Sequence, residues 1–166
     1  MANIFEPRFE PEEDWPDGYG GRWAPVGRDA GTKHLGASLY EVDPGQVLCP
    51  YHWHAGNEEM LIVLRGTPTL RTPAGRRPLA EGEVVAFLQG EEDAHTVINE
   101  GGDPVRLLML SEMNGPDVIV YPDSDKVLAR QVASGSPAEG IRALFRLTDQ
   151  VDYWEGEVPP HDVETR

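Results

Sequence analysis

Three of the five histidines in this chain lie with one glutamate in two glycine-bracketed segments, at spacings suited to one metal ion. His52 and His54 are two residues apart, so on a strand both imidazoles point to the same face and can meet at one point. Glu59 follows them closely, and His95 lies in the second segment. Three imidazoles and a carboxylate suit Mn, Fe, Ni, Zn or Cu. These four residues therefore predict a single metal site.

Strand-like runs must bring these ligands together. The short, polar loop 55–58 predicts a hairpin that returns the chain into a strand opened by Glu59. If Glu59 faces inward, strand parity turns Leu61 and Val63 inward too, and a later strand adds Val97. We expect these three apolar residues to wall a substrate pocket. The expected strands cover residues 38–42, 46–54, 59–65, 67–72, 83–88, 95–99 and 105–111.

The two segments resemble the two sequence motifs of the cupin superfamily, and the chain is similar to small single-domain bacterial cupins with a type-2 conserved barrel. The first motif matches at Gly45, His52, His54, Glu59 and Gly66, and the second at Gly82, Gly90, His95 and Asn99. Leu88 stands where proline is usual, and both motifs have altered loop lengths. The resemblance implies an all-β fold, a single double-stranded β-helix (cupin or jelly-roll barrel). It also implies that His52, His54, Glu59 and His95 bind one divalent ion, which we expect to be Fe, Mn, Ni or Zn.

Composition divides the chain around this barrel. Residues 1–34 are rich in proline, glycine and glutamate, and two tryptophans among them predict an irregular N-terminal arm packed on the barrel or on a neighbouring subunit. Residues 35–113 form the predicted barrel core. Residues 114–166 form a predicted C-terminal extension packing on the barrel.

Three segments of this extension carry more specific expectations. Residues 141–147 are expected to form an outer strand. Residues 152–156 are expected to close the fold, docked by their aromatic side chains. Residues 136–139 have the form of a helix start, but Gly140 follows at once, so we do not expect a helix there.

Charge and composition restrict the partners. A formal net charge of −15 argues against nucleic acids and anionic membrane surfaces. The sequence has no apolar run near the roughly 20 residues of a membrane span and no secretory signal at its start, so we expect a cytoplasmic protein whose partner is a small molecule. The acidic run 91–93 just before His95 is either a solvated loop or a feature that discourages polyanionic substrates.

The single cysteine and its neighbours predict an outward apolar face. Cys49 excludes an internal disulfide and shares the strand parity of Tyr51 and Trp53, so it is expected to face away from the metal as a packed apolar residue. Together with Met60 and Ile62, these side chains make a face too apolar for solvent. We therefore expect a homodimer, with coverage of this face by the N-terminal arm of the same subunit as the alternative.

Two functions fit the predicted site. In the first, the chain is a metalloenzyme, because a three-histidine, one-glutamate site leaves open positions for an oxygen-bearing substrate and permits dioxygenase-, isomerase- or lyase-type chemistry. In the second, it is a binding or sensing module without turnover, and a barrel whose histidines hold no metal is a further alternative. We favour the enzyme, because an open metal site in an apolar cavity is the usual place for catalysis.

Several residues have no position that the sequence settles. Asn99 ends the second motif and is expected to support a loop beside the substrate pocket. Possible acids and bases near the metal are Tyr40, Tyr51, Glu58 and Arg71. His34 and His161 are expected to be ordinary surface or loop residues.

Overall fold

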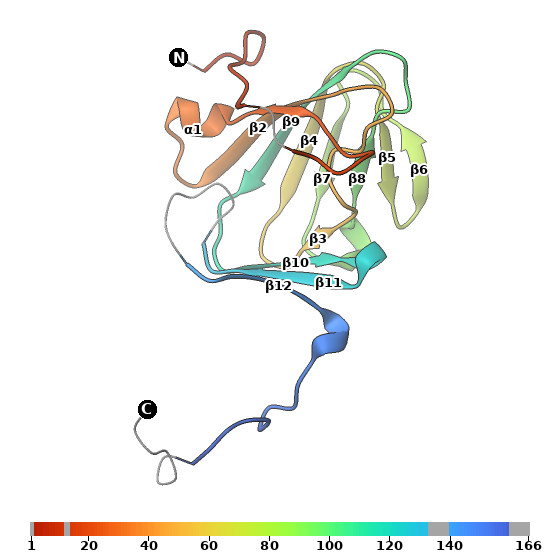
Figure 1. The fold of residues 1–166 in the computed structure, drawn as a ribbon. Coiled ribbons are helices and arrows are strands. Elements are labelled where there is room, and N and C mark those ends of the chain that lie inside the picture. Colours follow the sequence, from red (N-terminus) through yellow and green to blue (C-terminus); the bar gives the residue numbers. More distant parts are fainter. Residues whose placement is uncertain (1, 12–13, 133–139, 160–166) are drawn as a thin grey trace.

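Three antiparallel sheets make up the described part of the chain, residues 2–11, 14–132 and 140–159, in a computed structural model (Figure 1). The five-stranded sheet has the order β1 (Arg22–Ala24), β2 (Leu35–Val42), β9 (Val105–Glu112), β4 (Glu59–Arg65) and β7 (Val84–Phe87). The three-stranded sheet has the order β6 (Gly75–Pro78), β5 (Thr69–Thr72) and β8 (Thr96–Ile98). The four-stranded sheet has the order β12 (Arg142–Arg146), β11 (Lys126–Arg130), β10 (Asp117–Tyr121) and β3 (Trp53–His54).

Helix is scarce among the described residues, as the sequence predicts. It consists of α1 (Val26–Ala30) and the single 3-10 turns η1 (Glu91–Asp93), η2 (Pro122–Ser124) and η3 (Leu147–Asp149). None of these helices is long and apolar enough to cross a membrane. The all-β class predicted from the strand pattern is confirmed.

One apolar core joins the five-stranded and three-stranded sheets. Its buried members come from β2, β4, β7 and β9 on one side and from β5 and β8 on the other: Val42, Leu61, Val63, Phe87, Val105, Leu107, Leu70 and Val97. Leu48 and Leu79 complete it from loops. Because side chains of both sheets share this core, the two sheets face each other as the walls of a barrel. The four-stranded sheet lies across one end of that barrel (Figure 1).

The predicted strand over residues 46–54 is interrupted, and this overturns the orientation expected for Cys49. Only β3 and single bridges at Val47 and His52 survive, because bends and Pro50, which has no N–H to donate, break the ladder. Strand parity therefore does not carry across the segment. Cys49 packs against the core, which confirms a packed apolar residue, and its Sγ lies 3.8 Å from His52 Nδ1, so its expected place on an outward apolar face is wrong.

The same break divides the apolar face from which a homodimer was predicted. Tyr51 is 9% exposed and therefore belongs to the interior. Met60 and Ile62 do lie on the outer face of β4, where they are partly exposed. Any dimer surface must be built around β4 without Cys49 and Tyr51.

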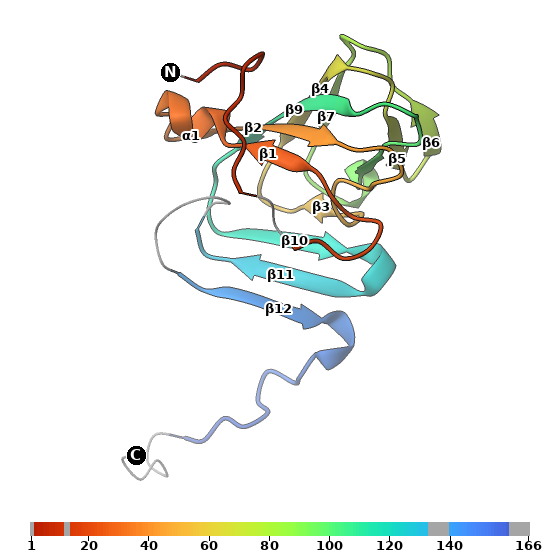
Figure 2. The ribbon, with the colours of Figure 1, turned by 45° about the horizontal axis from the view of Figure 1, so that its top comes forward.

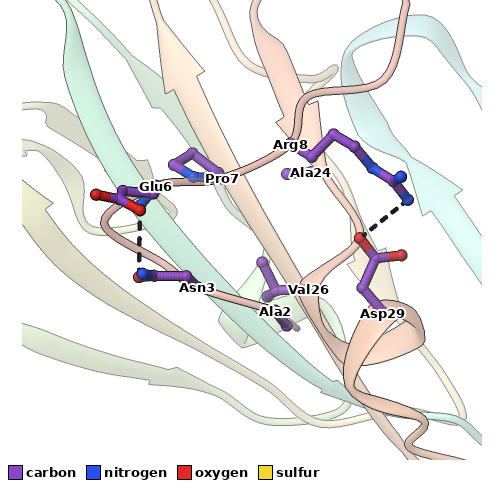
Figure 3. A pocket seen from close by; sticks show the side chains of 8 residues that line it. All are labelled: Ala2, Asn3, Glu6, Pro7, Arg8, Ala24, Val26 and Asp29. Atoms are coloured by element: carbon purple, nitrogen blue, oxygen red, sulfur yellow. Dashed lines mark hydrogen bonds and ion pairs between the residues drawn. The ribbon is translucent and has the colours of Figure 1, made fainter.

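The N-terminal arm packs on the outer face of the five-stranded sheet. Ala2, Ile4 and Phe9 contact a small cluster of Ala24, Val26 and Leu39. Strand β1 pairs with β2 along its whole length (Figure 2). The arm, β1 and α1 enclose a cavity of about 260 Å³, and an ion pair between Arg8 and Asp29 spans it (Figure 3). None of the predicted metal ligands lines this cavity.

The C-terminal extension splits into a paired part and an unpaired part. Strands β10, β11 and β12 form a meander whose first strand pairs with β3, and β12 confirms the strand predicted over residues 141–147. Beyond β12 the chain runs away from the sheets (Figures 1 and 2). Tyr153 and Trp154 are 81% and 73% exposed, so the prediction that residues 152–156 dock by their aromatics is wrong. Residues 136–139 and His161 lie outside the described residues.

Candidate metal centre

Strand ends and a bridge bring the four predicted ligands to one end of the barrel. His54 ends β3, Glu59 begins β4, and His95 directly precedes β8. His52 and His95 form an isolated antiparallel bridge, in which each backbone N–H donates to the carbonyl of the other residue, at 3.1 and 2.8 Å. Directly opposed residues in such a bridge present their side chains on one face. The centre is therefore positioned by main-chain pairing.

The donor atoms converge on the carboxylate of Glu59. Ligand atoms of His52, His54 and Glu59 all lie within 4.8 Å of one another. Oε2 of Glu59 lies 3.5 Å from His54 Nε2 and 3.3 Å from His95 Nε2. The ring centroids of His52 and His95 are 4.8 Å apart. The structure thus gathers all four residues that the sequence predicts.

Hydrogen bonds hold the Nδ1 atoms on the far side of each ring. His52 Nδ1 contacts the Pro50 carbonyl at 2.8 Å, and His95 Nδ1 contacts the Asp93 carbonyl at 2.9 Å. His54 Nδ1 contacts a carboxylate oxygen of Asp117 at 2.6 Å. A histidine that donates Nδ1–H to a carbonyl or carboxylate presents Nε2 as a free donor to a metal, and this arrangement is usual around bound ions.

An orphaned nitrogen shows that the donor set fits a cation. His95 is 2% exposed, and its Nε2 makes no hydrogen bond within the described residues. The ring stacks parallel to Phe87 with centroids 3.7 Å apart, which stabilises its orientation. Buried polar atoms normally have partners, and one that lacks a protein partner calls for an ion or water. Three imidazole nitrogens and a carboxylate suit a divalent transition metal.

Burial and mutual charges set the protonation states of the centre. Burial, together with the neighbouring His95, lowers the pKa of His52 to about 4. Burial also disfavours charge on His54, but the hydrogen bond with Asp117 and the charge of Glu59 outweigh it and raise the pKa of His54. Burial would raise the pKa of Glu59, yet the neighbouring His95, His54 and His52 hold it below its usual value. Glu59 is therefore ionised at neutral pH.

Two residues of β10 complete the site, and both escaped the sequence analysis. Asp117 is 5% exposed and fixes His54, while its second oxygen accepts from Gly56 N at 2.9 Å. Tyr121 stacks near His52 with ring centroids 6.0 Å apart. Burial raises the pKa of Tyr121, so its phenol keeps its proton. The one sequence feature that could have indicated their role is the alternation of side chains along an extended run, which puts Asp117 and Tyr121 on one face.

The predicted pocket walls belong to the packed core. Leu61, Val63 and Val97 are 0%, 1% and 1% exposed and pack within the apolar cluster beneath the centre. Strand parity turned them inward correctly, but the barrel is filled at that depth. Asn99 is fully buried, and its amide bonds to the backbone of Val42, Gly101 and Asp103, which supports the loop as expected. These four residues form the floor of the site and its support.

The candidate acids and bases lie in other surroundings. Tyr51 lies beneath the Arg71 guanidinium at 4.0 Å, and Arg71 pairs with Asp123. Glu58 is exposed, while Tyr40 packs against the core. His34 is exposed before β2, as expected for a surface histidine.

The acidic run 91–93 forms η1, whose Asp93 carbonyl orients His95. A hollow of about 310 Å³ lies beside it, lined by Tyr51, Pro73, Glu91, Glu92, Ala94 and Pro122.

Comparison with known proteins identifies the barrel. Residues 38–111 match the family model of the cupin domain. A segment of 87 residues, 45% of this chain, is 36% identical to the auxin-binding protein ABP19a of Prunus persica. That match spans 37% of the relative's own length.

Solved structures share the fold over most of the chain. A protein of Acidithiobacillus ferrooxidans, provisionally named a sugar phosphate isomerase, is 28% identical with a TM-score of 0.71, and 81% of each chain is covered. A sugar phosphate isomerase of the cupin superfamily from Silicibacter pomeroyi is 22% identical with a TM-score of 0.75, over 90% of this chain and 94% of the other. The fold is thus a double-stranded β-helix with a candidate three-histidine, one-glutamate centre. Residues 38–111 form a cupin domain.

The effect of the Asp117–His54 hydrogen bond on metal binding can be tested by substitution. Metal binding must displace the proton of His54, so we expect metal affinity to rise with pH until the raised pKa of His54 is passed. Asp117→Asn removes the interaction that raises this pKa. We expect this substitution to weaken metal affinity by roughly 10- to 100-fold. It should also lower the pH at which metal affinity reaches its plateau. Chelator-competition titrations between about pH 5 and pH 8 measure both effects.

Asp123→Asn is the matched control, because Asp123 is an exposed carboxylate that pairs with Arg71. It should leave both the affinity and the position of the plateau unchanged. An Asp117→Asn protein with the wild-type pH profile would contradict this role of Asp117.

Proposed function

We propose that the chain is a metal-binding cupin and a metalloenzyme that acts on an oxygen-bearing small molecule, by dioxygenase- or isomerase-type chemistry. His52, His54, Glu59 and His95 are the proposed ligands of one divalent ion. The observation that carries the proposal is the buried His95 Nε2, which faces Glu59 and has no hydrogen bond within the described residues. A divalent ion supplies Lewis acidity to a bound oxygen atom.

The surrounding residues have separate proposed roles. Asp117 holds His54 in the tautomer that presents Nε2, and Phe87 holds the plane of His95. Tyr121 keeps its proton beside His52 and is the proposed hydrogen-bond donor to a ligand oxygen. Burial raises the pKa of the Cys49 thiol to about 12, so this side chain stays neutral and does not act as a nucleophile.

Two relatives point to different uses of such a site. The Acidithiobacillus ferrooxidans protein, which is 28% identical, carries a provisional isomerase name and supports isomerase chemistry as the first activity to test. The Prunus persica protein, which is 36% identical over part of the barrel, is named for binding auxin and supports the second candidate, a small-molecule binding module without turnover. Both candidates need the same centre and differ in turnover alone.

Removing ligands tests the centre. We expect His54→Ala and His95→Ala to lose most bound metal while the barrel stays folded, because the apolar core lies beneath the centre and does not include these side chains. His34→Ala is the matched control, since it removes an exposed histidine. Metal-free protein reconstituted separately with Fe, Mn, Ni or Zn and measured by elemental analysis, with circular dichroism for the fold, reports both properties. Full occupancy in a His52→Ala, His95→Ala double variant would contradict the proposal.

Turnover separates the two candidates. The reconstituted forms are assayed with sugars and keto acids for isomerisation and with phenols and enols for oxygen consumption. Product formation that disappears in His54→Ala and persists in His34→Ala supports the enzyme. Saturable ligand binding without product across this panel would favour the binding module.

A second copy of this chain is the proposed protein partner. On the outer face of the five-stranded sheet, Ile62 lies opposite Val84, which is 54% exposed, while the N-terminal arm packs on the neighbouring part of the face. We expect light scattering to give twice the chain mass of 18.3 kDa, and Val84→Asp to return the protein to that mass. Val118→Asp, a change at an exposed valine of β10, is the control and should leave the dimer intact. A wild-type mass near 18.3 kDa at micromolar concentration would refute this partner.

A further inference from the structure

The positive charges of this acidic chain are unevenly partnered. Lysine and arginine total 14 against 29 aspartates and glutamates, so carboxylate partners are plentiful. Among the described residues, eight arginines have a carboxylate oxygen within 4.0 Å: Arg8, Arg22, Arg28, Arg65, Arg71, Arg76, Arg77 and Arg106. Five described cations have none, and apart from Lys33 all of these belong to two adjacent strands, β11 and β12. They are Lys126, Arg130, Arg142 and Arg146.

Strand register places these four charges on one face. Lys126 lies directly opposite Arg146, and Arg130 directly opposite Arg142, with a leucine pair between them. Like charges directly opposite each other destabilise a sheet. Arg146 donates to the Ser124 carbonyl at 3.5 Å, which does not neutralise its charge.

Protection of a sheet edge accounts for only half of the pattern. Charged side chains on an edge strand discourage aggregation, and β12 is an edge strand. Strand β11, however, lies inside its sheet between β10 and β12. Lys126 and Arg130 are partly buried there, where a charge without a counterion is unfavourable.

The cationic face is continuous with the metal centre. On β10, Tyr121 lies opposite Lys126 and Asp117 opposite Arg130. Ile119, between them, is paired with His54 on β3, and β10 lies beside β3 (Figure 2). Directly paired residues share a face, so the cations and His54 lie on the same side of this sheet.

Two neighbouring contacts link the cationic face to the ligands. Lys126 Nζ lies 5.7 Å from the ring centroid of Tyr121, and that ring stacks on the proposed ligand His52. Burial, and then the charge of Arg142, lower the pKa of Arg130, while the charge of Asp117 acts in the opposite direction.

We propose that Lys126, Arg130, Arg142 and Arg146 bind the phosphate group of a phosphorylated small molecule whose oxygen-bearing end reaches the centre at His52, His54, Glu59 and His95. Four cations suit a dianionic phosphate better than a single carboxylate, and guanidinium groups bind phosphate through paired hydrogen bonds. In a chain of net charge −15, this face also gives a dianion a favourable approach. The position of the reacting end rests on the proposed function, whereas the phosphate site depends on the four cations alone.

Inorganic phosphate is the probe that tests the cationic face directly. Calorimetric titration of the full chain at constant ionic strength should show saturable binding with one phosphate per chain. An Arg130→Gln, Arg142→Gln double variant should weaken this binding at least about tenfold, because it removes two charge-assisted contacts. Lys126→Gln should also weaken it. Lys33→Gln, the matched control, removes a described lysine that likewise has no carboxylate partner and should bind as the wild type does.

Titration of metal-free and metal-loaded protein separates this proposal from the proposed function. Phosphate binding that is kept in metal-free protein supports the cationic face even if no metal binds the centre. Absence of saturable binding in both forms, an equal loss in Lys33→Gln, or tighter binding of acetate than of phosphate would overturn the proposal. So would a dimer that dissociates in the double variant without any phosphate binding, since the face would then be an interface between two copies of the chain.

Discussion

The candidate centre depends on the hydrogen bonds that occupy three histidine Nδ1 atoms. The Pro50 carbonyl, the Asp117 carboxylate and the Asp93 carbonyl each hold one ring, so each Nε2 is left free on the side of Glu59. A buried carboxylate is costly unless a cation or a protonated group lies beside it. The main-chain bridge between residues 52 and 95 fixes two members of this set, and the proposed divalent ion would supply the positive charge beside Glu59.

The surroundings of the centre are electrostatically asymmetric. On one side η1 presents acidic side chains to a hollow of about 310 Å³. Strands β11 and β12 present cations without carboxylate partners among the described residues. An anionic ligand would be repelled by the acidic side chains and attracted to the cations. In this account the sheet formed by β3, β10, β11 and β12 supplies a ligand, the residue that orients it and the charge that selects the substrate.

The local sequence pattern correctly predicted the orientation of side chains that lie in regular strands. Strand β4 pairs on both sides, with β7 and β9, so parity placed Glu59, Leu61 and Val63 on the inner face correctly. Parity failed for Cys49, because bends and Pro50 interrupt the segment that was expected to be a strand. Asp117 escaped prediction because its contact with His54 joins residues 63 apart in the sequence, through the pairing of β10 with β3. No local pattern encodes that pairing. The prediction that residues 152–156 dock on the barrel was wrong. Aromatic composition indicates that the side chains tend to be buried, but it does not show that the barrel has a surface to receive them.

Anomalous diffraction from crystals of the protein loaded with a single transition metal would locate the ion at the proposed centre. We expect one anomalous peak within roughly 2.0–2.2 Å of Nε2 of His52, His54 and His95 and of a Glu59 carboxylate oxygen. The Nδ1 contacts to Pro50, Asp93 and Asp117 should persist in the loaded protein. A peak coordinated through Nδ1, or metal bound only at surface carboxylates with the four residues unchanged, would contradict the account.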